Sequence, residues 1–263
     1  MPEGVIVKEV DYLSKSGLTA ALQGQDAVID ATFARDAVTS SNLIEASVAA
    51  GVHRFILSEY GNDLDNPKFA ALPILHYKVA NYQLIQEKAQ ERGITWTALA
   101  TGPFLDGYLL TGSLGIQLKD KKATLFNDGK GVVPFAPVAI VGQAAAAVLL
   151  HPDETKNRRV YISAACKSQA DLLNLGKEAL GPDGWAIQSR HMEPAYKQSL
   201  ADVEAGKVDI KVFGTLMQYA ISNPEYYQPW MKDDNQLLGV KQLSDAEAKD
   251  MTKSIALGEW ASS

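Results

Sequence analysis

The chain has 263 residues, of which 46% are hydrophobic and 21% charged, and its formal net charge is −6. These values are ordinary for a soluble globular protein, and the length suits one large α/β domain or two smaller units that share a core. The negative net charge and the lack of a Lys/Arg cluster argue against a protein that binds nucleic acids non-specifically. No apolar run is long enough to cross a bilayer.

Cysteine and histidine usage argues against disulfides and metal centres. The one cysteine, Cys166, follows a predicted strand and is interpreted as a buried structural thiol. The four histidines share no ligand-like spacing, so we expect no metal. Residues 1–5 contain neither a charged leader nor an apolar core, so we expect a cytoplasmic protein with no membrane partner; its oligomeric state is left open.

The first hundred residues predict strands and helices that alternate in short steps. Strands are expected at 5–11, 26–32, 53–58 and 94–100, and helices at 14–23, 37–50 and 74–92. This rhythm is typical of βαβ units with right-handed crossovers and helices on both faces of the sheet. We therefore predict an α/β fold with a Rossmann-like, doubly wound parallel sheet.

After Gly102 the rhythm changes. The sequence predicts a turn-rich exit at 102–108, a strand with a tight turn at 123–131, a helix at 138–150, a strand at 159–163, a helix at 168–180 and mainly helices from Met192 onward. We predict a first domain over 1–135, to which residues 138–164 return, and a smaller α+β, mainly helical substrate-binding part over 165–263.

One lysine stands out at the point where a predicted strand ends. The apolar strand of 53–58 runs into Ser58-Glu59-Tyr60-Gly61, and open α/β sheets bind their ligands at such carboxyl ends. The next predicted helix has one stripe formed by Ala71, Leu75, Lys78, Tyr82, Ile85 and Ala89. Lys78 is the only charge on this stripe, so partial desolvation should lower its pKa and make it a candidate acid or base. The alternative is a lysine at the edge of the stripe with its ammonium in water.

Four segments, in order, resemble one family of proteins. Residues 54–63 resemble the segment R-F-x-P-S-E-F-G-x-D, and residues 93–104 resemble G-I-x-x-T-x-L-x-x-G-x-F. The opening strand and the L-x-G-x-D-A-V-I approach to the next strand fit as well, as does Lys78 on the following helix. From about Gly4 to Leu150 the chain is thus similar to the NmrA-like and isoflavone-reductase-like atypical short-chain dehydrogenases.

The resemblance implies a dinucleotide-binding fold that prefers NADPH, with residues 1–135 as the NAD(P)-binding domain. Lys78 would touch the nicotinamide ribose and act as the catalytic proton donor. The other cofactor-binding residues would be Thr32 and Phe33 near the adenosine half, and Ser58, Glu59, Tyr60, Gly102, Pro103 and Phe104 near the nicotinamide. Four aromatic residues are interpreted as walls of a flat substrate pocket, or alternatively as core or exposed caps: Tyr108, Tyr226, Tyr227 and Trp230.

The chain also departs from the family pattern. No G-x-G-x-x-G turn occurs in it, and by this pattern an opening βαβ portion of roughly 30 residues is absent. Strand 5–11 is therefore expected either to pair with strand 26–32 or to dock poorly. Residues 137–142 replace the family's Thr…Asp-Ile helix start, so we expect that helix to lack an N-terminal cap and a carboxylate.

The sequence leaves three alternative hypotheses of function, the first of which is the leading one. The first is an NADPH-dependent reductase acting on a small aromatic or phenylpropanoid-like molecule, with no nucleic-acid partner. The second is a non-catalytic sensor, similar to NmrA regulators, that binds a dinucleotide or a partner protein. The third is a truncated chain without a cofactor, which the missing glycine turn favours.

Overall fold

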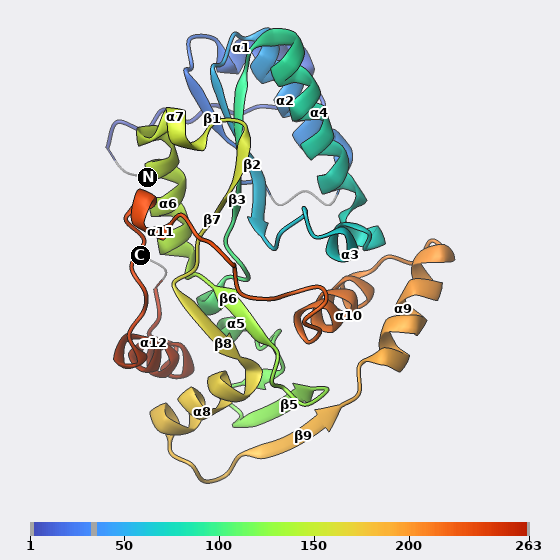
Figure 1. Ribbon diagram of the computed structural model, residues 1–263, viewed down its shortest axis with the longest axis vertical. Coiled ribbons are helices and arrows are strands. Elements are labelled where there is room, and N and C mark those ends of the chain that lie inside the picture. Colours follow the sequence, from blue (N-terminus) through green and yellow to red (C-terminus); the bar gives the residue numbers. More distant parts are fainter. Residues whose placement is uncertain (1–2, 33–35, 262–263) are drawn as a thin grey trace. The chain divides into compact units, whose positions relative to one another are not determined.

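The computed structural model describes residues 3–32 and 36–261, and its main sheet has four parallel strands (Figure 1). They run in the order β1 (Ala27–Ile29), β2 (Arg54–Gly61), β3 (Thr95–Ala100) and β7 (Arg158–Tyr161). β1 pairs with β2 in parallel, with Ala27 opposite Arg54. The predicted Rossmann-like α/β class is confirmed, although β1 is only three residues long.

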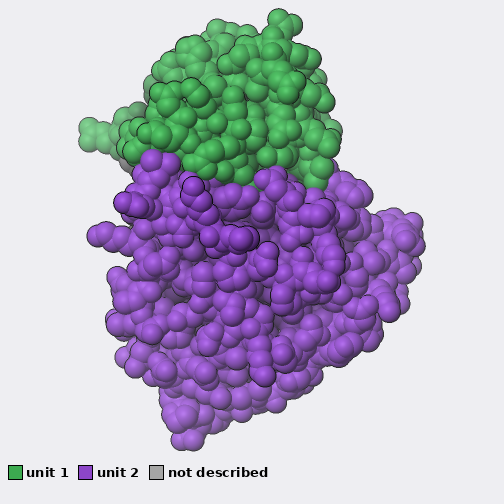
Figure 2. All heavy atoms as spheres, in the orientation of Figure 1, with its two compact units in different colours: residues 1–59, 77–99, 148–159 green, residues 60–76, 100–147, 160–263 purple. Residues whose placement is uncertain are grey.

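The chain divides into two compact units, coloured separately in Figure 2. Unit 1 comprises residues 1–59, 77–99 and 148–159, and unit 2 comprises residues 60–76, 100–147 and 160–263. Each unit is therefore assembled from three separate stretches of the sequence.

The helices of unit 1 are α1 (Lys15–Leu22), α2 (Ala37–Ala49), α4 (His76–Arg92) and α7 (Pro152–Thr155), and the first two begin at a side-chain cap. The Ser14 hydroxyl accepts from the backbone N–H of Gly17, and the Asp36 carboxylate accepts from that of Thr39, which satisfies donors left open at the starts of α1 and α2. The unit 1 core is apolar and includes Leu18, Ile44, Phe55, Ile85 and Trp96.

The predicted strand at 5–11 does not form. These residues have no regular structure, and Val5, Ile6 and Val7 are 49%, 82% and 70% exposed. A segment of strand-forming residues becomes a strand only where another strand accepts its hydrogen bonds, and in the described chain β1 pairs with β2 alone. The expected pairing with residues 26–32 is therefore wrong, and the alternative, a poorly docked segment, holds. A hydrogen bond from Lys8 Nζ to the carbonyl of Ala21 connects the segment to α1.

A buried arginine ties α7 to the sheet. Arg54 Nη1 donates to Thr97 Oγ1 at 2.8 Å, and Arg54 Nη2 donates to the carbonyl of Pro152. The Thr97 hydroxyl in turn donates to the carbonyl of Thr155 at 2.8 Å. Burial lowers the pKa of Arg54, with the opposing charge of Asp153 raising it, so the guanidinium depends on these partners for its hydrogen bonds.

We expect Arg54→Met to lower the free energy of unfolding by about 2 kcal/mol, because buried carbonyl and hydroxyl oxygens lose their charged donor. Urea denaturation monitored by circular dichroism measures this change. Arg92→Met, at the exposed end of α4, is the matched control and should alter stability by less than about 0.5 kcal/mol. Equal stabilities of the two variants would contradict a role for Arg54 in the fold.

Unit 2 contains two small sheets and most of the remaining helices. The sheets have the orders β4-β5-β9 and β6-β8. The strands are β4 (Ile116–Gln117), β5 (Lys122–Phe126), β6 (Val132–Phe135), β8 (Ala165–Ser168) and β9 (Ala186–Arg190). The helices are α3 (Pro67–Ala70), the 3-10 helix η1 (Pro73–Leu75), α5 (Leu105–Thr111), α6 (Val138–Leu150), α8 (Gln169–Leu180), α9 (Glu193–Glu204), α10 (Ile210–Ile221), α11 (Asn235–Leu238) and α12 (Asp245–Leu257). The last turn of α6, from residue 148, belongs to unit 1.

Three local predictions need correction. Cys166 is exposed rather than buried, because its strand β8 pairs with β6 in a two-stranded sheet that leaves its side chain uncovered. The helix predicted at 74–92 begins at His76, and Leu75 belongs to η1. The start of α6 does have a carboxylate: the N–H of Val138 donates to Asp106 Oδ1 at 3.1 Å, so α5 supplies what the local sequence lacks.

Candidate functional site

Lys78 lies at the carboxyl end of β2, where α4 carries it. Its Nζ donates to the carbonyl oxygens of Ser58 at 2.7 Å and Glu59 at 2.9 Å. An ammonium has three N–H groups, and among the described residues these two bonds are the ones it makes. The side chain is half-buried. One N–H of Lys78 therefore remains for a ligand oxygen at the edge of the sheet where open α/β folds bind ligands.

The surroundings of Lys78 lower its pKa. Desolvation by burial is the largest cause, whereas the negative charges of Glu59 and Asp30 raise the pKa and the positive charge of Arg159 lowers it. Lys78 consequently gives up a proton more readily than a lysine in water. A lowered pKa of this kind suits a lysine that donates a proton to a bound ligand.

The end of β1 is joined to the end of β2 by a polar network. Asp30 is buried, and its Oδ1 accepts from the Thr32 N–H at 2.9 Å and the Thr32 hydroxyl at 2.6 Å. Its Oδ2 accepts from the Ser40 hydroxyl at 2.8 Å, and the Ser58 hydroxyl donates to the carbonyl of Thr32 at 2.7 Å. Thr32, Ser58 and Lys78, all predicted site residues, thus share one network in unit 1. The predicted residue Phe33 lies outside the described residues.

The sequence analysis missed an ion pair at this site. Arg159 of β7 places Nη1 3.4 Å from Glu59 Oε2, and the two side chains are 2% and 3% exposed. The Cζ atom of Arg159 lies 4.8 Å from the centre of the Tyr82 ring on α4. Asp30 was missed as well, although an aspartate two residues before a threonine at a strand end is a signal for such a turn.

The remaining predicted cofactor residues lie in unit 2. Gly102 has φ +65°, and its N–H donates to the carbonyl of Gly61 at 3.0 Å. A Cβ at Gly102 would lie 1.8 Å from the carbonyl oxygen of Pro134, so this close backbone approach requires glycine. Phe104 forms an isolated parallel β-bridge with Ala136. The structure brings Gly102–Phe104 against β6, while Tyr60 lies on the last part of β2.

Two of the predicted substrate residues, Tyr227 and Tyr108, are buried or half-buried in unit 2. Tyr227 is 2% exposed and packs edge-on against Phe69, with ring centres 5.5 Å apart. Burial raises the pKa of Tyr227, and the charge of Tyr108 adds to this. Burial also raises the pKa of Tyr108, on α5. Neither phenol is poised to lose its proton, so neither resembles a catalytic base.

The other two line an open, polar cleft of about 300 Å³ in unit 2. Trp230 Nε1 donates to the carbonyl of Ile162 at 2.9 Å, which fixes its indole, and the Tyr226 hydroxyl lies 3.3 Å from that of Tyr196. The lining residues are Asn62, Asp63, Asp65, Asn66, Pro67, Tyr226, Gln228 and Trp230. The structure thus brings together Tyr226, Trp230 and the residues that follow Gly61.

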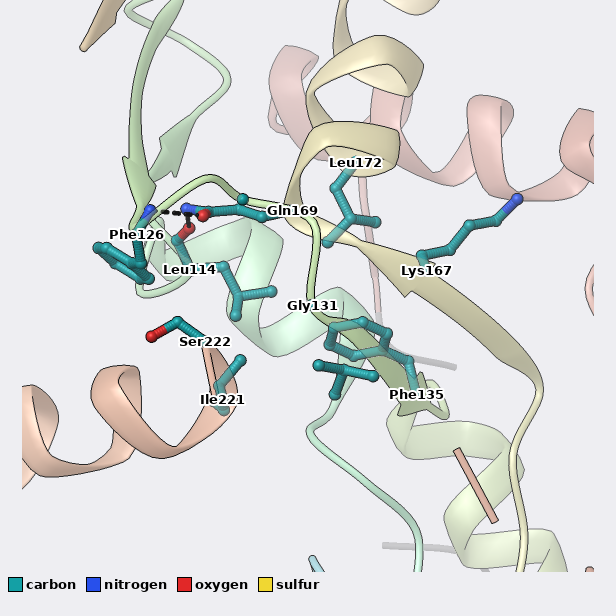
Figure 3. Close-up of a pocket in the computed structure, with 11 residues that line it drawn as sticks. Leu114, Phe126, Gly131, Phe135, Lys167, Gln169, Leu172, Ile221 and Ser222 are labelled. Carbon is teal, nitrogen blue, oxygen red and sulfur yellow. Dashed lines mark hydrogen bonds between the residues drawn. The ribbon is translucent and has the colours of Figure 1, made fainter. Parts of the chain in front are cut away.

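A second pocket of unit 2 is apolar but small. Figure 3 shows Leu114, Phe135, Leu172 and Ile221 around it, and the side-chain amide of Gln169 bonded to the backbone. Its volume of about 20 Å³ suits one water molecule rather than an organic ligand. The Lys167 ammonium pairs with Asp245 Oδ1 at 2.7 Å.

The described residues also bear on metal binding and on membrane insertion. No three His, Cys, Asp or Glu side chains among them are grouped so as to hold a metal ion. Among the same residues, every helix is too short or too polar to span a bilayer.

Comparison with known proteins identifies the family. The sequence model of the NmrA-like family matches residues 2–200. The chain is 30% identical over 209 residues to the oxidoreductase aprR of Aspergillus flavus, which covers 79% of this chain and 70% of that protein. It is 29% identical over 262 residues to the oxidoreductase poxI of Penicillium oxalicum, covering 94% of this chain and 80% of that protein.

Solved structures share the fold at lower identity. The Citrobacter sp. triphenylmethane reductase complexed with NADP(H) has a TM-score of 0.71 at 20% identity, over 95% of this chain and 84% of that one. The TM-score of an isoflavone reductase is 0.67 at 19% identity, over 97% and 82% of the two chains. Together with the sequence match, the parallel sheet and the Lys78 segment show that this chain belongs to the NmrA-like family.

Proposed function

We propose that this protein is an NADPH-dependent oxidoreductase that reduces a small aromatic or phenylpropanoid-like molecule in the cytoplasm. One observation carries the proposal: the Lys78 ammonium is held on two carbonyl oxygens at the end of β2 with a third N–H left for a ligand. The names of the relatives support it, since aprR and poxI are called oxidoreductases and the E. coli quinone oxidoreductase QOR2, of the same fold, is complexed with NADPH.

The residues of unit 1 fit the nicotinamide-ribose half of this cofactor. A ribose hydroxyl can accept from the remaining N–H of Lys78, and Ser58 is fixed beside Lys78 by the bond from its hydroxyl to the carbonyl of Thr32. NADPH supplies a hydride when bound. The fit concerns this half alone, because the chain has no G-x-G-x-x-G turn to hold the pyrophosphate.

In the proposed reaction Lys78 holds and then moves a proton. Its third N–H is shared between the ribose hydroxyl and the substrate oxygen, and the proton passes to that oxygen as negative charge develops there. The lowered pKa eases this transfer, and the carbonyls of Ser58 and Glu59 keep the amine in place while solvent restores its proton. Tyr226 and Trp230 line the polar cleft of unit 2 and are proposed to bind an aromatic molecule there.

The test is NADPH binding followed by turnover. Titration of the protein into NADPH, monitored by nicotinamide fluorescence, should give saturable binding. Addition of 1,4-benzoquinone, or of coniferaldehyde as a phenylpropanoid probe, should then accelerate NADPH oxidation above the protein-free rate. Binding without turnover on either probe would favour the NmrA-like sensor, and the absence of binding would reject the reductase in favour of a chain without cofactor.

A further inference from the structure

Glu59, near the end of β2, contacts both Lys78 and a second charged residue, Arg159. Its carbonyl oxygen accepts from Lys78 Nζ at 2.9 Å, and its carboxylate pairs with Arg159 at 3.4 Å. The two paired residues lie 100 positions apart in the sequence and are 3% and 2% exposed. One residue therefore contacts the candidate proton donor through its backbone and a buried guanidinium through its side chain.

Stability alone does not account for this pair. Removing two charges from water opposes folding, and apolar side chains of similar volume often stabilise a core as well as a buried ion pair does. The pair is also held in one geometry, since the Tyr82 ring lies 4.8 Å from the Arg159 Cζ atom, and Tyr82 is one turn beyond Lys78 on α4. Its orientation is thus fixed relative to the helix that carries Lys78.

We propose that Glu59 and Arg159 are positioning residues for Lys78. Arg159 fixes the Glu59 side chain, so that the end of β2 presents two carbonyl oxygens to the ammonium, and the Glu59 carboxylate keeps that ammonium charged. The inference rests on the proposed function, in which Lys78 holds the nicotinamide ribose and donates a proton.

The charges that face Lys78 come from three strands of the main sheet or from the residue that follows one of them. They are Glu59 of β2, Asp30 after β1 and Arg159 of β7, and the two acids raise the pKa of Lys78 whereas Arg159 lowers it. Removing the Glu59 charge should therefore lower that pKa further. Removing both members of the pair should lower it less, because the loss of Arg159 acts in the opposite direction but has the smaller effect of the two.

The test follows the Lys78 side chain directly in the unliganded protein. Protein labelled with 13C-lysine is titrated by NMR, and a Lys78→Arg variant assigns the Lys78 Cε signal. We expect Glu59→Gln to lower the pKa of Lys78 by about 1 and Glu59→Gln/Arg159→Met to reverse part of this decrease. Glu91→Gln, which removes an exposed partner of Lys88 on the same helix, should leave it unchanged.

A parallel measurement reports on position rather than charge. The double variant should bind NADPH about tenfold more weakly than wild type at a pH where Lys78 is protonated in both, because the carbonyl acceptors are no longer anchored. Arg159→Lys, which keeps the charge without the planar fork, should recover part of this loss.

Two outcomes would overturn the inference. One is an equal pKa of Lys78 in Glu59→Gln and Glu91→Gln. If Glu59→Gln does not fold, the double variant decides, and an NADPH affinity equal to that of wild type then overturns it. A wild-type protein that binds no NADPH rejects the proposed function instead, and the NMR comparison still tests the pairing of Glu59 with Lys78.

Discussion

Replacing Lys78 with methionine is expected to lower kcat for NADPH oxidation by about a hundredfold to ten-thousandfold. Methionine fills similar space but has no proton to donate and no bond to offer the carbonyls of Ser58 and Glu59. The wild-type rate should fall as pH rises through the pKa of Lys78, which burial places below the ordinary lysine value, because the protonated amine is the donor. This high-pH limb should be missing from the rate profile of Lys78→Met.

Lys88→Met is the matched control for that experiment. Lys88 lies on the same helix, and its ammonium pairs at the surface with Glu91 at 2.9 Å. Its loss should leave kcat and its pH profile unchanged. A Lys78→Met protein that folds normally and retains the wild-type rate would remove Lys78 from the mechanism.

The second large effect concerns stability. We expect Gly102→Ala to lower the free energy of unfolding by about 3 kcal/mol or more. An alanine at φ +65° is strained, and its Cβ would lie 1.8 Å from the carbonyl oxygen of Pro134, which is backbone and must move. Thermal unfolding by differential scanning calorimetry measures the change as a lower Tm.

A second glycine provides the comparison. Gly142 lies inside α6, and a Cβ added there would meet no atom within 4 Å. Gly142→Ala should therefore be neutral or stabilise the protein by up to about 1 kcal/mol, since alanine favours the helix. Similar Tm values for Gly102→Ala and Gly142→Ala would show that the close approach at Gly102 relaxes freely.

Local patterns predicted much of the fold and the central residue of the candidate site. α6 has the predicted bounds 138–150, and β2 and α4 lie within a few residues of their predictions. Helical spacing singled out Lys78, because residues one turn apart share a face and Lys78 is charged between apolar neighbours. That reasoning needs only a few consecutive turns of sequence.

Features that depend on distant partners were not predicted. The β-branched residues at 5–7 predict a strand, but whether a neighbouring strand exists is not a local property. Glu59 and Arg159 are 100 residues apart, so no spacing rule joins them. The same holds for Asp106, which supplies the start of α6 with a carboxylate from a different helix.

The division of the chain also bears on how such a protein can change during evolution. Each compact unit is assembled from three non-adjacent stretches, so no contiguous piece of the gene encodes either one. Recombination of a single block would therefore either divide a unit or carry part of the other unit with it. New substrate preferences in this lineage should accordingly arise through point substitutions and short insertions in connecting loops, and not through the exchange of a ready-made module.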